Sequence, residues 1–585
     1  MRRGIPVSPG VAVGTAYCIH EIFVNPDTKK LADDEVTAEL ARYESARDKT
    51  ADDLRALQKK VAAQVGREEA DIFVVQESIL RDAAFTHKIR RWISDERLTS
   101  QASLHRFLNE YASLFARTKD DYLRERLNDV RDVVVRISAH LSDVLRPETG
   151  VLPGPLIVVA DELLPSQVVA MGNIEVRGIV TQSGSQTSHA AIIARSRGIP
   201  AVSGVRGVLR QVRTGDTIVV DGRDGHVVVN PDAEACSAYR KLEREFFDLK
   251  DELAENRDLP AKTQDSIDIE LLANINALSD TEAAKAMGGS GVGLFRTEYL
   301  FLVHPSVPDE EEQLQGYRGI IEAAPNHRVT IRTLDIGGDK TVPYLGHKHT
   351  EANPFMGWRS IRLSFEHPEF FTTQLRAILR AAAEFDEGDV RIMFPMITTL
   401  EEVRRVRGMV RRACSQLKDE GKPYRATPVG MMLEVPAAAV SIDNILPAVD
   451  FVSIGSNDLV QYLMAADRDN PKVSHLCQPL SPAVLRVLTN VIAACNQSNT
   501  PVTLCGEMAA QPRAFVLLFG MGLRSFSMSP AFIPSVKELA SHLSAETAEA
   551  ILKQALQLKT TSQVKRYMAD QVQRIAPNVA IMDTT

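Results

Sequence analysis

The chain has 585 residues, of which 44% are hydrophobic and 25% charged, with a formal net charge of −8. The length allows several domains with full cores, and the acidic balance argues against a nucleic-acid or membrane-surface binder, because those proteins need a basic face. No run of about 18 apolar residues predicts a membrane-spanning helix, and the six cysteines follow no metal-ligand or disulfide spacing. We therefore expect a cytoplasmic protein with reduced thiols, no nucleic-acid partner and no membrane insertion.

The first 260 residues alternate between strand-like and helical composition. Short β-type runs broken by glycine and proline occupy residues 4–20, and similar runs return after residue 150. Between them the chain is rich in Glu, Ala, Arg and Leu, with apolar residues at helical spacing. The simplest interpretation is one α/β domain, residues 1–24 and 146–230, into which a bundle of four helices, residues 25–145, is inserted. Residues 231–260 have the charged pattern of a stiff linker helix.

Eight short apolar segments alternate with helical stretches in the rest of the chain. This pattern predicts a (β/α)8 barrel over residues 261–575, followed by a C-terminal tail, residues 576–585. Barrel enzymes carry their functional groups at the C-terminal ends of the strands, so polar residues that follow the strands should meet at one mouth. The expected strands are 267–276, 291–296, 329–336, 390–396, 429–435, 451–456, 502–505 and 525–528.

A phosphoryl acceptor is suggested in the α/β domain. A polar turn leads through Ser188 into an Ala- and Ile-rich run that ends at Gly198, which is typical of a capped helix with His189 in its first turn. The free N–H groups and partial positive charge of a helix N-terminus suit an anion. His189 is a candidate phosphoryl carrier, although a histidine beside a cap is more often an ordinary helix-end residue.

The barrel residues predict a cationic, metal-binding mouth. Glu434 and Asp458 end neighbouring strands and suit Mg²⁺, which takes one or two protein carboxylates beside water and substrate phosphate. An ordinary surface arginine is the alternative for each arginine candidate, most strongly for Arg359 and Arg468. The glycine turn before the candidate lysine is weak evidence. The candidates for binding a phosphate or carboxylate are Arg296, Arg332, Lys340, Arg359 and Arg468.

A thiol at the same mouth limits the class of substrate that the site can take. Cys505 ends the seventh strand and is either a core thiol or a proton donor. Cations, a divalent metal and a thiol acid together suit a small phosphate ester that also carries a carboxylate. Phosphoenolpyruvate fits that description, with Cys505 protonating C3 of the enolate that remains when the phosphoryl group leaves.

Seven motifs, in order along the chain, resemble enzyme I of the bacterial phosphoenolpyruvate:sugar phosphotransferase system. The resemblance extends over nearly the whole chain and includes 122–126 and 129–132 in the bundle. The motifs are Thr187-Ser188-His189, Gly-Leu-Phe-Arg-Thr-Glu at 293–298, Arg-Thr-Leu-Asp-Ile-Gly-Gly-Asp-Lys at 332–340, Asn-Pro-Phe-Met-Gly-Trp-Arg at 353–359, Glu-Val-Pro-Ala at 434–437, Gly-Ser-Asn-Asp-Leu at 455–459 and Leu-Cys-Gly-Glu-Met at 504–508.

The resemblance implies the first step of that system. His189 would accept the phosphoryl group, with Thr187 orienting its ring, and Cys505 would complete pyruvate. The carrier protein HPr would receive the group while docked on the inserted bundle, the α/β domain would swivel between partners, and the barrel would form a homodimer. By the same resemblance Glu434 and Asp458 hold Mg²⁺, and phosphoenolpyruvate is bound by Arg296, Arg332, Lys340, Arg359, Asn457 and Arg468.

Three positions depart from the family pattern, and two other functions fit parts of it. Ser185 stands where the family has glycine, and in the bundle Gln76 replaces a common histidine and Arg81 an acid, which suggests a divergent HPr. A pyruvate phosphate dikinase or phosphoenolpyruvate synthase shares the histidine domain and barrel, but needs an ATP-binding domain for which this chain has too few residues. A phosphoenolpyruvate sensor without turnover is disfavoured, because competent residues fill every candidate catalytic position.

Overall fold

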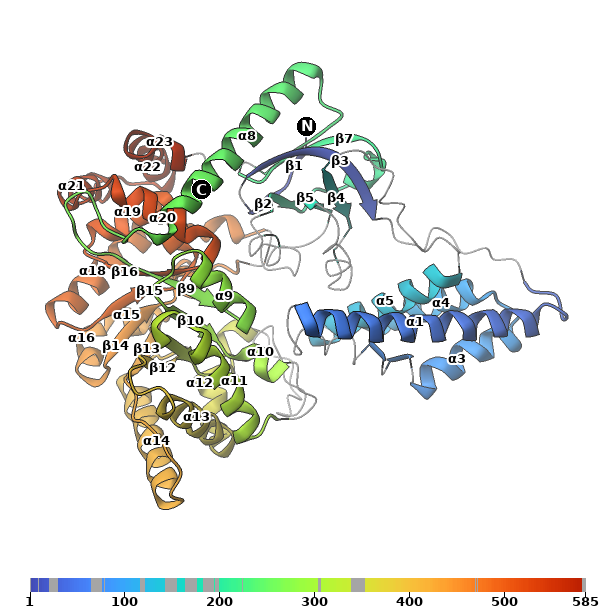
Figure 1. Cartoon of the computed structure of the whole chain (residues 1–585), viewed down its shortest axis with the longest axis horizontal. Helices are drawn as coiled ribbons and strands as arrows, with labels where there is room; N and C mark the ends of the chain where they lie inside the picture. Colours follow the sequence, from blue (N-terminus) through green and yellow to red (C-terminus); the bar gives the residue numbers. More distant parts are fainter. Residues whose placement is uncertain are drawn as a thin grey trace.

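The fold is described from a computed structural model of the chain (Figure 1). Among the described residues, no helix is both long enough and apolar enough to cross a bilayer. The structure describes residues 2–8, 10–19, 30–64, 76–77, 79–80, 82–115, 121–141, 155–161, 163, 176–182, 194, 199–223, 225–302, 307–337, 353–468, 470 and 472–580.

An eight-stranded sheet joins the beginning of the chain to residues beyond 155. Its order is β1-β8-β7-β3-β4-β5-β6-β2, and β3 pairs antiparallel with β7 and parallel with β4. Valine, isoleucine and alanine fill its interior, as expected for strands buried on both faces. The strands are β1 Arg2–Arg3, β2 Ile5–Ser8, β3 Val11–Ile19, β4 Leu156–Ala160, β5 Val176–Thr181, β6 Ala201–Ser203, β7 Thr217–Asp221 and β8 His226–Val229.

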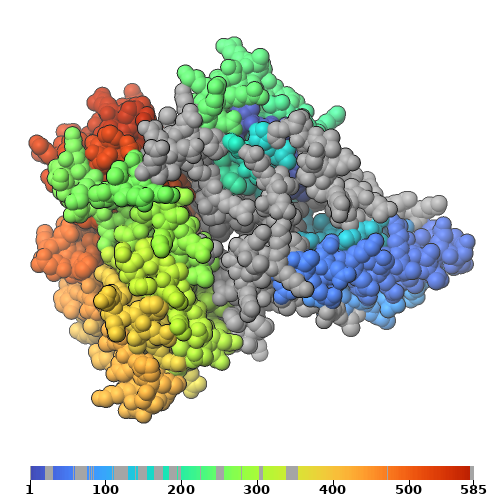
Figure 2. Space-filling model, in the orientation of Figure 1, coloured from blue at the N-terminus to red at the C-terminus, as the bar shows by residue number. Residues whose placement is uncertain are grey.

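Four described helices between β3 and β4 pack around a core of their own. They lie apart from the barrel in the ribbon view, and the two bodies occupy opposite sides of the space-filling view (Figures 1 and 2). Gln76 is buried here and donates a 3.0 Å hydrogen bond to Asp132. Its departure from the family pattern therefore affects the interior of the bundle and not a docking surface. The helices are α1 Val36–Gln64, α3 Ala83–Ser94, α4 Ser100–Phe115 and α5 Asp121–Leu141.

Helix α8, Ala233–Glu255, connects the sheet to the barrel. Near its start, Tyr239 and Leu242 pack on the valines of β3, and Glu243 accepts a hydrogen bond from the backbone N–H of Val13. Just beyond its end, the Lys537 ammonium donates to the carbonyl of Arg257 at 2.6 Å. The linker helix is thus anchored at both ends.

Eight parallel strands close into a barrel, which confirms the predicted fold class. The largest apolar cluster among the described residues lies between these strands and the surrounding helices. The strands are β9 Glu270–Ile275, β10 Val292–Arg296, β11 Val329–Arg332, β12 Val390–Phe394, β13 Val429–Leu433, β14 Phe451–Ile454, β15 Val502–Leu504 and β16 Ser525–Met528. The helices are α9 Leu278–Ala286, α10 Glu298–Leu302, α11 Glu310–Ala323, α12 Ile361–Glu366, α13 Pro368–Ala383, α14 Leu400–Asp419, α15 Pro436–Val440, α16 Ile442–Ile445, α17 Ser456–Met464, α18 Pro482–Gln497, α19 Pro512–Gly520, α20 Ile533–Ser541, α21 Ala545–Ala555 and α22 Thr561–Ile575.

The segment expected to be a tail differs from that expectation. It begins with a further helix, α23 Pro577–Ala580, and Val579 is fully buried in the barrel's apolar cluster. Ala576 is buried in the same cluster, so residues 576–580 pack with the barrel against α20 and α22.

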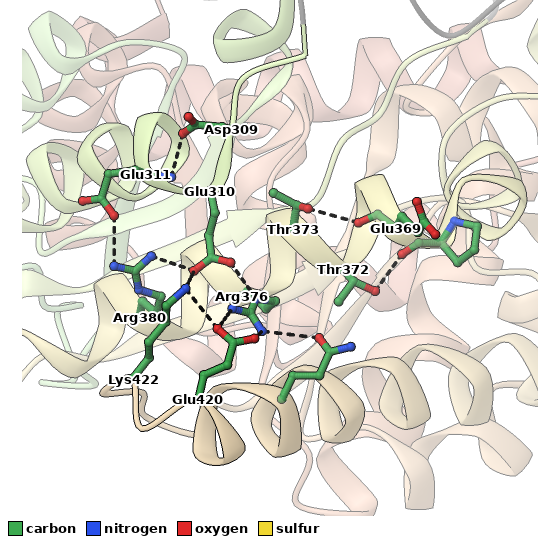
Figure 3. A network of polar contacts seen from close by, with 12 residues as sticks. Asp309, Glu310, Glu311, Glu369, Thr372, Thr373, Arg376, Arg380, Glu420 and Lys422 are labelled. Carbon is green, nitrogen blue, oxygen red and sulfur yellow. Dashed lines mark hydrogen bonds and ion pairs between the residues drawn. The ribbon is translucent and has the colours of Figure 1, made fainter.

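A charge network fastens three helices of the barrel together (Figure 3). Arg376 on α13 is buried and donates to Glu310 of α11 at 2.6 Å and to both carboxylate oxygens of Glu420, beyond α14, at 2.7 and 2.6 Å. Arg380 and Lys422 complete the network around the same two carboxylates. Because Arg376 is buried at the centre of the network, its loss should lower the stability of the barrel more than the loss of an exposed ion pair.

Replacing Arg376 with methionine should lower the free energy of unfolding of the barrel by about 3 kcal/mol, because two carboxylates lose their buried partner. The measurement is urea unfolding followed by Trp358 fluorescence in a Trp92→Phe background. The matched control is Arg318→Met, which removes an exposed pair with Glu384 and should cost under about 1 kcal/mol. Equal costs for the two variants would contradict this account.

The same network predicts a pH dependence with a definite sign. Hydrogen bonds from Arg376 and Lys422 lower the pKa of Glu420 to about 2. A carboxyl with a lowered pKa stabilises the folded state above its ordinary pKa, and that contribution is lost as the pH falls toward 2. The Arg376→Met variant should therefore lose less stability than the wild type between pH 4.5 and pH 2.

Candidate active site

The predicted barrel residues that the structure describes lie where the barrel strands end. Arg296 and Arg332 are direct partners in the pairing of β10 with β11. Leu433 of β13 pairs with Ile454 of β14, which in turn pairs with Leu504 of β15, so the residues that follow these strands begin at one level. Glu434, Asp458 and Cys505 are brought to the same mouth by this register.

Charges of opposite sign alternate across the mouth. Arg332 lies 2.9 Å from Glu298 and 3.1 Å from Asp335. Arg359 lies 3.0 Å from the other oxygen of Asp335 and 3.8 Å from Asp458. Asp335 therefore holds two guanidinium groups side by side, where together they can face a dianionic ligand.

The alternation keeps the arginines charged although they are buried. Burial opposes the charge of Arg332, but Glu298, Asp335 and Glu434 raise its pKa above the ordinary value. Burial likewise opposes the charge of Arg359, whereas Asp335 and Asp458 raise its pKa. The surface-arginine alternative is therefore excluded for Arg359, which is 5% exposed.

Arg468 and Asn457 line the outer part of the mouth. The Arg468 side chain is 31% exposed and lies 2.9 Å from Asp458. The backbone N–H of Arg468 donates a hydrogen bond to the Gln461 side chain, which fixes the backbone at this position. Asn457, in the first turn of α17, accepts a hydrogen bond from the backbone N–H of Glu507 at 3.0 Å. This bond leaves the amide N–H₂ of Asn457 as the group able to donate to a ligand.

Glu434 carries the most perturbed carboxyl of the site. Burial and the nearby charges of Asp458 and Asp335 raise its pKa to about 8. The backbone N–H of Met396 donates to one carboxylate oxygen at 2.6 Å, and at Gly455 a Cβ would lie 2.9 Å from the other. Glu434 and Asp458 are neighbouring hard oxygen donors in a buried site, so they fit a divalent ion.

The donor set also limits how an ion would be held. Among the described residues, no group of three or more His, Cys, Asp or Glu side chains is arranged to hold a metal. Glu434 and Asp458 are hard oxygen donors, and Mg²⁺ commonly binds to one or two carboxylates while water and substrate phosphate fill its other positions. The residues present fit Mg²⁺ better than a metal that needs a full protein cage.

Cys505 lies between the apolar interior of the barrel and the charges of the mouth. It clusters with Leu294, Met393, Met432 and Phe451, and its thiol donates to the carbonyl of Ile454 at 3.5 Å. Burial raises its pKa, although the charges of Arg332 and Arg296 oppose that effect. The thiol is therefore protonated at neutral pH, as a proton donor must be.

Arg296 differs from the other arginines of the site. Burial and the neighbouring charge of Arg332 lower its pKa, and its nearest described partner is the neutral Asn276 at 3.4 Å. A guanidinium that lacks a strong carboxylate partner has charge available for an anionic ligand. We therefore expect Arg296 to gain most from a bound phosphate.

Comparison with known proteins identifies the family. Three segments match phosphoenolpyruvate-utilising enzymes: the N-terminal domain over residues 3–126, the mobile domain over 152–225 and the phosphoenolpyruvate-binding domain over 250–545. The phosphoenolpyruvate-protein phosphotransferases of Haemophilus influenzae and Bacillus subtilis are each 36% identical, over 97% of this chain and 99% of theirs. That of Bacillus sp. (strain S) is 38% identical over 97% of both chains. This chain belongs to the phosphoenolpyruvate-protein phosphotransferase family.

A solution NMR structure of Enzyme I, 32% identical, covers 42% of this chain and all of its own with a TM-score of 0.35, which is too low to argue from. The match to the phosphoenolpyruvate-binding domain spans every barrel residue assigned above to the mouth. The match to the mobile domain spans His189. The family assignment therefore rests on sequence along the whole chain and not on one motif.

Some of the predicted positions in this phosphotransferase-family chain cannot be placed. They lie outside the described residues, so their roles remain predictions. They are His189, Thr187 and Lys340, together with the two departures Ser185 and Arg81.

Three residues at the mouth received no role from the sequence. Glu298 is buried and accepts hydrogen bonds from Arg332 and from the backbone N–H of Asp335. Tyr462 donates to the carbonyl of Phe355 at 2.5 Å and accepts from Arg359 at 3.3 Å. Glu298 and Asp335 lie in the same sequence motifs as Arg296 and Arg332. Their closeness to these arginines in the sequence was the signal that could have indicated a role as ion-pair partners. No sequence signal could have indicated Tyr462, because its hydrogen-bond partners are about a hundred residues away in the chain.

Proposed function

We propose that this chain phosphorylates itself on His189 from phosphoenolpyruvate, releases pyruvate, and passes the phosphoryl group to the histidine of an HPr carrier. This is the first step of a phosphoenolpyruvate-dependent phosphotransferase system. The observation that carries the proposal is the mouth of alternating charge, where Arg332 and Arg359 are held together by Asp335 beside two crowded carboxyls. The names of the full-length relatives support the same reaction.

The proposed reaction begins with substrate binding at the mouth. Arg296, Arg332 and the neighbouring cations Lys340, Arg359 and Arg468 bind the phosphate and carboxylate of phosphoenolpyruvate, and Asn457 donates a further hydrogen bond. Mg²⁺, bound by Glu434 and Asp458, would neutralise charge on the phosphoryl oxygens. Buried, pre-oriented arginines suit this task because they need no reorganisation during the reaction.

Two steps, phosphoryl transfer and then proton transfer, complete the half-reaction. The imidazole nitrogen of His189, oriented by Thr187, forms the P–N bond while the P–O bond to the enol oxygen breaks. The enolate that remains takes a proton at C3 from the Cys505 thiol, which gives pyruvate and a thiolate. The thiolate regains its proton from water, so the balance needs no other co-reactant.

Replacing Cys505 with alanine should lower pyruvate-forming turnover by about a hundredfold or more, because a general acid contributes on that order. The Michaelis constant for phosphoenolpyruvate should change little, since the arginines bind the substrate. The matched control is Cys495→Ala on α18, a fully buried thiol whose loss leaves the mouth intact. Turnover that falls equally in both variants would identify Cys505 as a packing residue only.

A labelling experiment tests the proposed function. Incubation with labelled phosphoenolpyruvate and Mg²⁺ should give an acid-labile phosphoprotein, and added HPr should remove the label. Absence of label would overturn the proposal and favour a sensor. Labelling from ATP in the absence of phosphoenolpyruvate would instead indicate a dikinase or synthase.

The proposed partners include a second copy of the chain, joined through the barrel, besides HPr docked on the bundle. Three large apolar side chains support the homodimer: Met356, Val440 and Leu476 are exposed in segments that follow β11, β13 and β14. We propose that the dimer interface covers these exposed apolar side chains. We place the reaction in the cytoplasm, where six free thiols stay reduced.

Replacing Val440, which is 85% exposed, with arginine should convert the dimer to monomer at micromolar concentration, because a charge would be buried in the contact. Analytical ultracentrifugation measures the change. Leu259→Arg is the control, since this exposed residue lies between the linker helix and the barrel. An unchanged dimer in the Val440 variant would place the interface elsewhere.

A further inference from the structure

Helix α14 carries a basic surface that the proposed reaction does not use. Between residues 403 and 418 the helix contains six cations and no acid, in a chain whose net charge is −8. Its buried residues, which include Val403, Val406 and Val410, face the barrel. The helix projects from the barrel in the ribbon view and forms an amber ridge in the space-filling view (Figures 1 and 2). The cations are Arg404, Arg405, Arg407, Arg411, Arg412 and Lys418.

The outward line of this surface has no partner within the described part of the chain. Arg405 lies over the ring of Phe365, and Arg407 pairs with Asp450. Arg404, Arg411 and Lys418 are exposed, and no described residue forms an ion pair or hydrogen bond with them. They recur every seven residues, so they lie along one side of the helix over about 21 Å.

Nothing in the described part of the chain packs closely enough to require the glycine in the middle of this line. Gly408 lies between Arg404 and Arg411, and a Cβ there would meet nothing nearer than the end of the Arg411 side chain at 4.0 Å. A glycine inside a helix costs roughly 0.5–1 kcal/mol relative to alanine. Its presence gives a partner room to approach the helix backbone between the arginines.

The charges at the two ends of the helix decide which kind of partner fits. Glu401 precedes the basic stretch and Asp419 follows it, and both are exposed. A nucleic acid or an anionic membrane presents continuous negative charge and would meet these acids at both ends. A short acidic helix with a basic residue at each end matches the whole pattern.

We propose that the outward face of α14, defined by Arg404, Gly408, Arg411 and Lys418, docks an acidic helical segment of another protein. The partner helix lies along α14, with carboxylates spaced to meet the three cations and a small contact at Gly408. This surface lies on the outside of the barrel, so the proposal is independent of the reaction at its mouth.

The test uses the full chain and a synthetic helical peptide with glutamates at seven-residue spacing and a lysine at each end. Fluorescence anisotropy should show salt-sensitive binding to the wild type. The triple variant Arg404→Gln, Arg411→Gln, Lys418→Gln should bind about tenfold more weakly, as expected for the loss of three exposed ion pairs. The control variant, Arg486→Gln, Lys553→Gln, Lys559→Gln, changes charge equally elsewhere and should bind as the wild type does.

Two comparisons make the result specific. Gly408→Ala should weaken peptide binding about threefold while raising the thermal midpoint, because alanine favours the helix but fills the approach. A scrambled peptide of the same composition should bind to the wild type as weakly as the original peptide binds to the triple variant. The proposal would be overturned if the scrambled peptide bound to the wild type as tightly as the original peptide, or if the triple variant kept the wild-type affinity. Tighter binding of duplex DNA or phosphatidylserine vesicles than of the peptide would also overturn it.

Discussion

Replacing His189 with alanine should abolish labelling from phosphoenolpyruvate, the largest effect that we expect from any single substitution. Alanine has no nitrogen to form the P–N bond, so no transfer can occur even though the arginines still bind the substrate. The measurement is the acid-labile phosphoprotein formed from labelled phosphoenolpyruvate and Mg²⁺, with a limit of detection below about one part in a thousand of the wild-type signal.

Two controls separate loss of the acceptor from loss of the fold. His226→Ala removes a histidine of β8 and should leave labelling intact. The His189→Ala chain should still be stabilised by phosphoenolpyruvate in thermal unfolding, because ligand binding at the barrel raises the midpoint. Label that persists in His189→Ala would move the phosphoryl acceptor to another residue.

Replacing Glu434 with glutamine should lower turnover by about a thousandfold, because the site would lose one of the two carboxylates that we propose bind Mg²⁺. Glutamine has the same shape and its carbonyl can still accept from the backbone N–H of Met396, so the fold should be retained. Single-turnover phosphorylation across a Mg²⁺ titration measures both the rate and the metal requirement. Asp443→Asn, an exposed acid on α16, is the matched control and should be neutral.

The Glu434→Gln variant should also change the pH dependence of stability. In metal-free protein the pKa of Glu434 is raised to about 8 from an ordinary 4.5, so the folded state binds the proton more tightly than the unfolded state. Stability from this group is present at low pH and is lost as the pH rises toward 8. With a chelator present, the wild type should lose more thermal stability than Glu434→Gln between pH 5.5 and pH 8.5. Parallel curves would contradict the raised pKa.

The barrel was predictable because its signals are local. Short runs of valine, isoleucine and leucine followed by polar residues specify parallel strands that are buried on both faces, and every expected barrel strand contains an observed one. Because parallel strands end at the same side of a barrel, Arg296, Glu434 and Cys505 could be assigned to one mouth before any contact was known. The family resemblance added roles to these positions, which await the experiments above.

The partners of the charges were decided only by the tertiary structure. Arg359 could be judged exposed from sequence, yet it is buried because Asp335 and Asp458, 24 residues before it and 99 after it, both reach its guanidinium. Gln76 could be read as a docking residue, yet it bonds to Asp132 inside the bundle. Local pattern determines which residues form strands and where polar groups leave them. The partners of each charged group come from segments that are distant in the chain. Composition and local spacing do not encode these pairings.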